Sequence, residues 1–506
     1  MNNYPRSLLI SIVSVPLLAL LLAWVSSGFT SVHGWLSFAA VLILGLLEIM
    51  LVWRLISAEK PPDWLLSLVL LAAFLRLALG VFWFLALPSW GYDTEVQRAG
   101  YIMEDALHRD DVSWELSQSG KPLYHAFQYY SHTDQYGGLL FHNAAIFRYL
   151  GTDIHYPLLT VAVSAIFSSL AVALVWAVAN ILWDKIAANM SAWFLAFYPE
   201  AMLLGSSQMR EAFTVTLAAG AIYTFLRFWD ERNWLRFFVM LVPLIICLAF
   251  SPGFTAFLLL TLALLALTFY DWDWLRNQSP WLVIGWGLVS LIAITVIISY
   301  NFDIIFDTDY QTYLTTLASG KVQAIFERTP EWSHAPFLVL YGVFRPLLPA
   351  ALAATGNHLW QAIAIWRALG WTVLLFLILY ATFLILRRKL RFDSAFVLLT
   401  LNWLFIISAS YRGGGDMWDN PRYRVSFAAV QVMLAAWALM QQRDTKDPWL
   451  RRTIGMTASM ILWFLLWYVD RKIIDFGFPI VWIPDIILLG LLTGGLYVIW
   501  DWRKKR

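Results

Sequence analysis

The sequence predicts an all-α integral membrane protein, and three observations support that prediction. Hydrophobic residues make up 60% of the chain and charged residues 13%, whereas soluble domains average about 45–50% apolar and about 25% charged. Apolar stretches recur along the sequence, and many reach the roughly 20 residues that a helix needs to cross a bilayer. Many of the 29 tryptophans stand at the ends of these stretches, where an indole ring can lie among lipid headgroups. We expect no soluble domain and no nucleic-acid partner.

The length rule predicts about fourteen transmembrane helices. The first apolar stretch follows Arg6 and is too long for the core of a typical signal peptide, so we expect it to remain as a helix. The predicted spans are residues 7–28, 35–56, 64–87, 157–183, 186–205, 211–229, 234–250, 253–270, 281–300, 360–386, 393–410, 425–440, 453–468 and 479–500.

A further apolar run, residues 337–354, carries Arg345, Pro346 and Pro349 at its centre. We expect a re-entrant or kinked segment here, because a full crossing would place the basic cluster at 387–391 outside, whereas Lys and Arg are enriched in cytoplasmic loops. Both termini are then cytoplasmic, in a multi-pass protein of the plasma (inner) membrane. Three polar segments share the extracytoplasmic face, namely residues 88–156, 301–336 and 411–424.

The same reasoning divides the chain into four parts. Residues 1–60 hold two N-terminal helices, and residues 61–300 hold a helical module with the outer loop 88–156. Residues 301–336 form an outer loop, and residues 337–506 form a C-terminal module with the outer loop 411–424. The single cysteine, Cys247, lies in an apolar stretch, which excludes an intramolecular disulfide and a cysteine metal cluster.

The first outer loop gathers acids, histidines and aromatic residues. Asp93 follows the third predicted span directly, which keeps its carboxylate close to any cavity between helices. Behind it we expect a short interfacial helix whose apolar residues, at positions 96, 101–103 and 107, face the membrane. The acids at 104, 105, 110 and 111 are better explained as partners of a helix dipole than as catalytic groups. Further cavity candidates in this loop are Glu95, His132, Asp134 and Tyr136.

Charged residues also interrupt the apolar run FYPEAMLLGSSQMREAF. Glu200 lies within a predicted span, where a charge costs roughly 2.5–3.5 kcal/mol and usually faces a cavity or a partner. Arg210 and Glu211 lie at the outer turn that follows. A structural ion pair between Glu200 and Arg210 and a functional role are equally compatible with this pattern.

The third outer segment, SYRGGGDMWDNPRYR, is rich in arginine on the face that normally avoids it. The guanidinium groups of Arg412, Arg422 and Arg424 suit phosphate oxygens, and Arg345 needs an anion or an acidic partner. Tyr423 and Asp419 are further candidates, and the alternative is an ordinary loop with snorkelling arginines. The outer histidines at 125, 132, 142, 155 and 334 lack metal-binding spacing, and no phosphate-binding loop or GxSxG motif occurs.

The sequence resembles the GT-C glycosyltransferases, which include protein mannosyltransferases and aminoarabinose transferases. The resemblance is based on Asp93 after a span with an interfacial helix behind it, on FYPEAMLLGSSQMRE with its final charged pair, and on NPRYR before an apolar span. It extends over roughly residues 76–437. The chain differs in having two extra spans before the loop, and in carrying Glu211 where relatives often have a second aspartate.

The resemblance implies transfer of a sugar from a polyprenyl-phosphate donor to a glycan, lipid or protein acceptor at the extracytoplasmic face. Asp93 would act as the general base, with Glu211 as a second catalytic acid. The phosphate would be held by Arg210, Arg345, Arg412, Arg422 and Arg424. A divalent metal, Mg²⁺ or Mn²⁺, could bind Asp93 and Glu211, and no other cofactor is expected.

Other functions remain open at this point. A polysaccharide polymerase or ligase uses a similar donor with arginine clusters but no aspartate base. A lipid or oligosaccharide transporter (flippase) would be expected to carry an internal repeat, and the sequence shows no clear one. A non-catalytic membrane scaffold would tolerate changes at both Asp93 and Arg422.

Overall fold

The computed structural model describes residues 6–128, 135–269, 316, 320–388, 392–413, 418, 420–475, 477–478 and 482–504. These residues form helices joined by turns and loops, and no strand occurs among them. The all-α prediction is therefore confirmed for the described part of the chain. The chain divides into two compact units, Met1–Thr312 with Arg422–Met433 and Tyr313–Pro421 with Leu434–Arg506.

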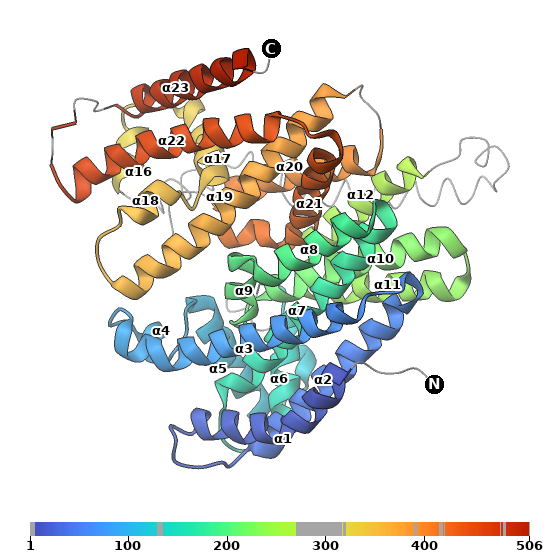
Figure 1. Ribbon diagram of the computed structural model, residues 1–506. Helices are drawn as coiled ribbons and strands as arrows, with labels where there is room; N and C mark the ends of the chain where they lie inside the picture. The colour runs from blue at the N-terminus through green and yellow to red at the C-terminus, as the bar shows by residue number, and fades with distance from the viewer. Residues whose placement is uncertain are drawn as a thin grey trace. The chain divides into compact units, whose positions relative to one another are not determined.

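Helix α7 (Pro157–Leu182) is the centre of unit 1. In its most apolar stretch 94% of the residues are buried in the protein, and α2, α3, α8 and α10 pack against it (Figure 1). Buried small residues such as Ala162, Ala165 and Ala173 allow this close approach of neighbouring helices. The other helices of unit 1 are α1 (Arg6–Ser26), α2 (Trp35–Ile56), α3 (Asp63–Trp90), α4 (Glu95–Arg98), α5 (Glu104–Gln118), α6 (Gly138–Leu150), α8 (Lys185–Phe197), α9 (Pro199–Gly205), α10 (Arg210–Glu231), α11 (Trp234–Phe250) and α12 (Pro252–Thr268), with the 3-10 turns η1 (Ser57–Glu59) and η2 (Leu123–Phe127).

The single span predicted for residues 186–205 is two helices in the structure. Pro199 cannot donate a backbone hydrogen bond, and α8 ends at Phe197 before α9 begins at Pro199. The buried Arg76 of α3 caps this break, because its Nη2 donates to the carbonyl of Leu195 (3.2 Å) and its Nη1 to that of Ala196 (3.5 Å). The last carbonyls of a helix lack hydrogen-bond partners within the helix. Arg76, although it lies in an apolar span, supplies these partners at the end of α8.

The first outer loop also differs from the prediction. Gly100, at φ 82°, turns the chain after α4, so that α4 and α5 are separate helices. The apolar residues 101–103 and 107, which we expected to face the membrane, are at most 9% exposed within the protein. Helices α5 and α6 pack around Leu116, Leu140 and Ala144, together with residues of η2. The loop therefore has a small core of its own that can hold polar groups in fixed positions.

Unit 2 consists of helices from the second half of the chain. Helix α17 ends at Phe344 and α18 begins at Leu348, so the apolar run 337–354 is interrupted around Arg345 and Pro346. Helices α22 and α23 pack along each other, and Arg452 Nε donates to Asp501 (2.9 Å) between them. The helices are α16 (Gly320–Phe326), α17 (His334–Phe344), α18 (Leu348–Leu352), α19 (His358–Arg387), α20 (Ser394–Gly413), α22 (Trp449–Lys472) and α23 (Ile483–Lys504), with η3 (Glu331–Ser333). The 3-10 turn η4 (Asn420–Phe427) and helix α21 (Ala428–Thr445) contribute to both units.

Nine helices in the described residues are long and apolar enough to cross a membrane. Three shorter apolar helices, including α11 and α12, add to them. The predicted span at 281–300 lies outside the described residues. The chain is thus a multi-pass membrane protein.

Two glycines of unit 1 give a matched test of this packing. A Cβ on Gly205 of α9 would lie 2.5 Å from Ser168 Oγ and 2.7 Å from Arg76 Cδ, whereas one on Gly220 of α10 would meet nothing closer than 3.6 Å. We expect Gly205→Ala to lower the free energy of unfolding by about 1–3 kcal/mol through overpacking. Gly220→Ala should leave it unchanged or raise it by up to about 1 kcal/mol, because glycine disfavours a helix. Thermal unfolding in detergent measures both, and equal stability of the two variants would contradict the packing described here.

Candidate functional site

Asp110 of α5 is a fully buried carboxylate that joins the first outer loop to α7. It accepts hydrogen bonds from Tyr101 Oη (2.5 Å) and from Thr160 Oγ1 (3.2 Å), and His155 Nε2 lies 2.7 Å from its Oδ2. His155 stacks on the ring of Trp114, with ring centroids 5.0 Å apart. Burial, followed by the charge of Asp110, raises the pKa of Tyr101 well above its ordinary value. The phenol therefore stays protonated and donates.

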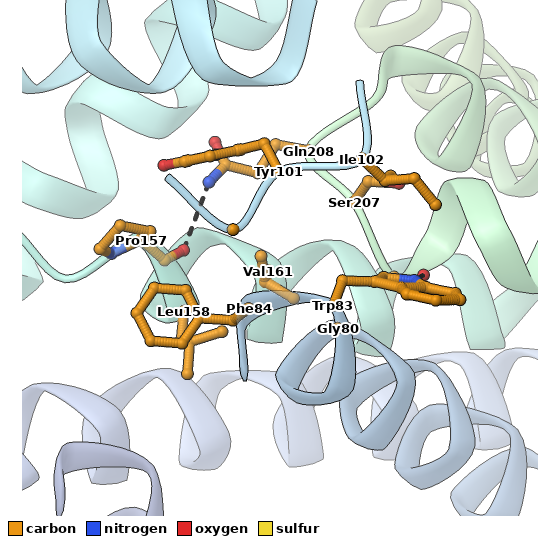
Figure 2. Close-up of a pocket in the computed structure, with 12 residues that line it drawn as sticks. Gly80, Trp83, Phe84, Tyr101, Ile102, Pro157, Leu158, Val161, Ser207 and Gln208 are labelled. Atoms are coloured by element: carbon orange, nitrogen blue, oxygen red, sulfur yellow. Dashed lines mark hydrogen bonds between the residues drawn. The ribbon is translucent and has the colours of Figure 1, made fainter. Parts of the chain in front are cut away.

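Next to the contacts of Asp110, two buried side-chain amides connect α6 to the turn before α10. Asn143 Nδ2 of α6 donates to Gln208 Oε1 (3.1 Å), and Gln208 Nε2 donates to the Pro157 carbonyl (3.3 Å). Figure 2 shows Gln208 and Tyr101 on one side of a small hollow, with Trp83 and Phe84 of α3 opposite. These bonds hold the α9–α10 turn against α6 and α7, and so fix the start of α10.

An ion-pair cluster in unit 1 links α5 to the segment before α21. Arg422 Nη2 donates to Asp105 Oδ2 at 2.6 Å, and Arg109 Nη2 lies 3.4 Å from the same oxygen. Burial raises the pKa of Asp105, but the charges of Arg422, Arg109 and Arg210 and the hydrogen bond from Arg422 outweigh burial. The pKa of Asp105 is thus lower than usual. The charges of three guanidinium groups therefore act on this one carboxylate.

Arg210 and Glu211 are adjacent on α10 but have different surroundings. The guanidinium of Arg210 lies 4.9 Å from the ring centroid of Tyr136. Glu211 is 3% exposed and lines a second small hollow together with Arg76 and Ser168. Glu200 is buried at the start of α9.

Asp93 and Glu95 lie on the exposed side of the first loop. The Asp93 side chain is 89% exposed and its carboxylate is 3.5 Å from Arg98 Nε. Glu95, the first residue of α4, is also exposed. The described residues place Asp105, not Asp93, in contact with Arg422.

The other arginine candidates are buried or half-buried. Arg424 is 2% exposed, and its backbone carbonyl accepts a hydrogen bond from Gln431. Arg422 also lies over the ring of Tyr423, 5.2 Å from its centroid. In unit 2, Arg345 follows α17 and lies 5.5 Å from the Tyr341 ring centroid, while Arg412 is in the last turn of α20. His132, Asp134 and Asp419 lie outside the described residues.

Sequence reasoning assigned Asp105 and Asp110 to a helix dipole and did not consider Arg109. A signal was present: at helical spacing on α5, Arg109, Asp110, Ser113 and Ser117 share the buried side of the helix with Ala106, Leu107 and Leu116. A polar stripe that is buried must face other polar groups. The prediction that the acids of α5 face solvent therefore missed the buried groups that they contact.

A candidate metal group occurs in the described residues at Asp110, Asp111 and His155. Each offers one ligand atom, and these atoms lie within 4.8 Å of one another. Carboxylate oxygens with one imidazole nitrogen suit Mn²⁺ or Zn²⁺ better than Ca²⁺. Asp93 and Glu211, the ligands predicted from the resemblance, have separate surroundings, with Asp93 largely exposed and Glu211 buried beside Arg76.

Residues 150–300 match the model of the dolichyl-phosphate-mannose-protein mannosyltransferase family, a GT-C family. The predicted resemblance to the GT-C glycosyltransferases is thereby confirmed in this part of the chain, which includes Glu200, Arg210 and Glu211. No curated protein matches the sequence.

Two solved structures are similar to this chain. One is the archaeal oligosaccharyltransferase AglB from Archaeoglobus fulgidus in complex with an inhibitory peptide and a dolichol-phosphate, with a TM-score of 0.38 and 15% identity over 85% of this chain and 54% of that one. The other is the Archaeoglobus fulgidus oligosaccharyltransferase in the apo form, with a TM-score of 0.41 and 15% identity over 86% of this chain and 56% of that one. The chain thus spans a little over half the length of these proteins.

The lowered pKa of Asp105 predicts an acid-sensitive contact. The pair with Arg422 contributes fully above the ordinary aspartate pKa of about 3.9, and its contribution is lost as the pH falls through the lower pKa of the folded state. We expect Asp105→Asn to lower the free energy of unfolding at neutral pH by about 1 kcal/mol, since solvent partly screens this carboxylate. The variant should also lose this part of the acid dependence.

Thermal unfolding in detergent between neutral and acidic pH measures the effect. Glu115→Gln, an exposed position on the same helix, is the control. If Asp105→Asn and Glu115→Gln show the same pH profile as the unaltered protein, Asp105 does not form the ion pair in solution.

Proposed function

We propose that this chain is a membrane glycosyltransferase that moves a sugar from a polyprenyl-phosphate donor to a glycan, lipid or protein acceptor at the extracytoplasmic face. The observation that carries the proposal is the cluster of Arg109, Arg210 and Arg422 around the carboxylate of Asp105. The family match over residues 150–300 supports the same class of reaction. The proposed topology has about fourteen spans, with both termini cytoplasmic and residues 337–354 re-entrant.

The guanidinium groups of the cluster suit phosphate oxygens. An anionic leaving group gains more from fixed guanidinium donors than the neutral sugar does, so the arginines stabilise charge that develops as the bond to phosphate breaks. Arg422 and Arg109 are held by Asp105, which limits the reorganisation needed when the donor binds. Arg424, Arg345 and Arg412 remain predicted contacts of the donor.

Asp93 is the better proton acceptor of the two loop aspartates. Asp105 has a lowered pKa and is engaged by two arginines, which makes it a weak base. Asp93 is exposed and can be reached by an acceptor hydroxyl from solution. In the proposed inverting displacement, the hydroxyl oxygen attacks the anomeric carbon, Asp93 takes its proton, and polyprenyl phosphate leaves. The surroundings of Glu211 do not support a catalytic role for that residue.

Two substitutions separate the proposed roles. Asp93→Asn should lower the turnover rate roughly 10²–10⁴-fold while leaving donor binding intact, because it removes the base and not the phosphate site. Arg422→Lys should weaken donor binding, since a lysine cannot reproduce the guanidinium geometry. Purified protein with radiolabelled polyprenyl-phosphate sugars gives the rates, and binding of the unlabelled lipid gives the affinities.

Glu104→Gln, an exposed position on α5, should change neither quantity. Full transfer by Asp93→Asn with loss of activity in Arg422→Lys would instead favour a polymerase or ligase that needs no aspartate base. Unchanged lipid binding in Arg422→Lys would contradict the phosphate site.

A metal ion is compatible with Asp110, Asp111 and His155, where it would supply positive charge beside the first loop. We expect Mn²⁺ to raise the unfolding temperature of the unaltered protein, and this shift to be lost in His155→Ala. A shift that persists in the variant would place the ion elsewhere. If the unaltered protein shows no shift, the contact of His155 with Asp110 has a structural role only.

A further inference from the structure

Arg76 and Glu211 are opposite charges that line one buried hollow in unit 1. Arg76 lies within α3 and is 1% exposed, and Glu211 lies in the first turn of α10 and is 3% exposed. The hollow is closed by Ser168 of α7 and by apolar residues of α8, α9, α10 and η4. Isolated charges in such an interior are costly, so each should have a partner there.

Among the residues that the structure describes, each of the two side chains has an atom without a protein partner. The Nη atoms of Arg76 donate to backbone carbonyls, but within the described residues its Nε has no hydrogen-bond partner. The same holds for Glu211 Oε2. The two side chains do not form a direct ion pair in the described part of the chain. A buried donor and a buried acceptor therefore face one hollow without touching.

The chemistry of the hollow selects its occupant. The guanidinium of Arg76 disfavours a metal cation, and the carboxylate of Glu211 disfavours an anion. A molecule that accepts from Nε and donates to Oε2 satisfies both atoms. Ser168 Oγ donates to the Ala165 carbonyl and can still accept a third bond. A buried water needs about two to four such partners, and the hollow has room for about one.

We propose that an ordered water in this hollow joins Arg76 Nε to Glu211 Oε2, so that the two residues form a water-mediated ion pair. The pair connects the capped end of α8 to the first turn of α10. Arg210 is the neighbouring residue in that turn, and its guanidinium lies over Tyr136 and acts on Asp105. Arg76 and Glu211 are thus positioning residues for Arg210.

A double-mutant cycle tests the pair without any substrate. Arg76→Met and Glu211→Gln should each lower the unfolding temperature in detergent, and the double variant should lose clearly less than the sum, because both act on one interaction. Arg76→Met combined with Glu59→Gln is the control, since Glu59 pairs with Arg227 instead and should give additive losses. Additive losses for Arg76 and Glu211 would overturn the proposal.

A high-resolution map of the unaltered protein provides a second test that requires no variant to fold. We expect a density peak within hydrogen-bonding distance of both Arg76 Nε and Glu211 Oε2. If other buried waters are visible and this peak is missing, the water-mediated pair is refuted.

Binding of a polyprenyl phosphate tests whether Arg76 and Glu211 position Arg210. Of the three tests, this one alone rests on the proposed function. Folded Arg76→Met should bind a polyprenyl phosphate more weakly than the unaltered protein, and Glu211→Asp, which keeps the charge, should bind more strongly than Glu211→Gln. Equal binding in all variants would overturn the positioning of Arg210. Absence of binding by the unaltered protein would refute the phosphate site of the proposed function while the result of the cycle still stands.

Discussion

The ion pair between Asp105 and Arg422 is the contact on which the candidate site depends. It joins the first outer loop to a segment that follows it by more than half of the chain, and it brings Arg109 to the same carboxylate oxygen. Without Asp105, three guanidinium groups would repel one another next to an apolar interior. With it, they form a fixed group of guanidinium donors around one carboxylate.

The loop that carries Asp105 is anchored by similar buried polar contacts. Asp110 accepts from Tyr101 and Thr160, and Asn143 reaches Gln208 in the turn before α10. In an interior this apolar, each such bond has a large cost if it is broken, because the separated groups have no water to replace it. The contacts therefore define one arrangement of α5, α6 and α7 better than apolar packing could, since apolar surfaces fit together in several ways.

The broken helix α8/α9 shows how a charge can be both structural and connected to a site. Arg76 caps the carbonyls that Pro199 leaves without partners, and the same side chain faces Glu211. The interruption leaves backbone carbonyls without partners in the helix. Arg76 donates to them, and this contact keeps its side chain beside the start of α10. Irregular backbone at membrane depth is tolerated only inside protein or along a cavity, and the residues on either side of Pro199 are buried.

The sequence by itself determined the class of protein and most of its helices, because apolar length is a local property and a bilayer imposes one length on every span. It also indicated the arginines of the NPRYR segment and the charged pair at the start of α10 as unusual. Only the tertiary structure decided which aspartate pairs with which arginine. Asp93 and Asp105 look alike in the sequence, yet one is exposed beside Arg98 and the other contacts Arg422. That choice depends on where helices distant in sequence come to lie, and on which face of α5 is buried, and neither is encoded in the residues around an aspartate.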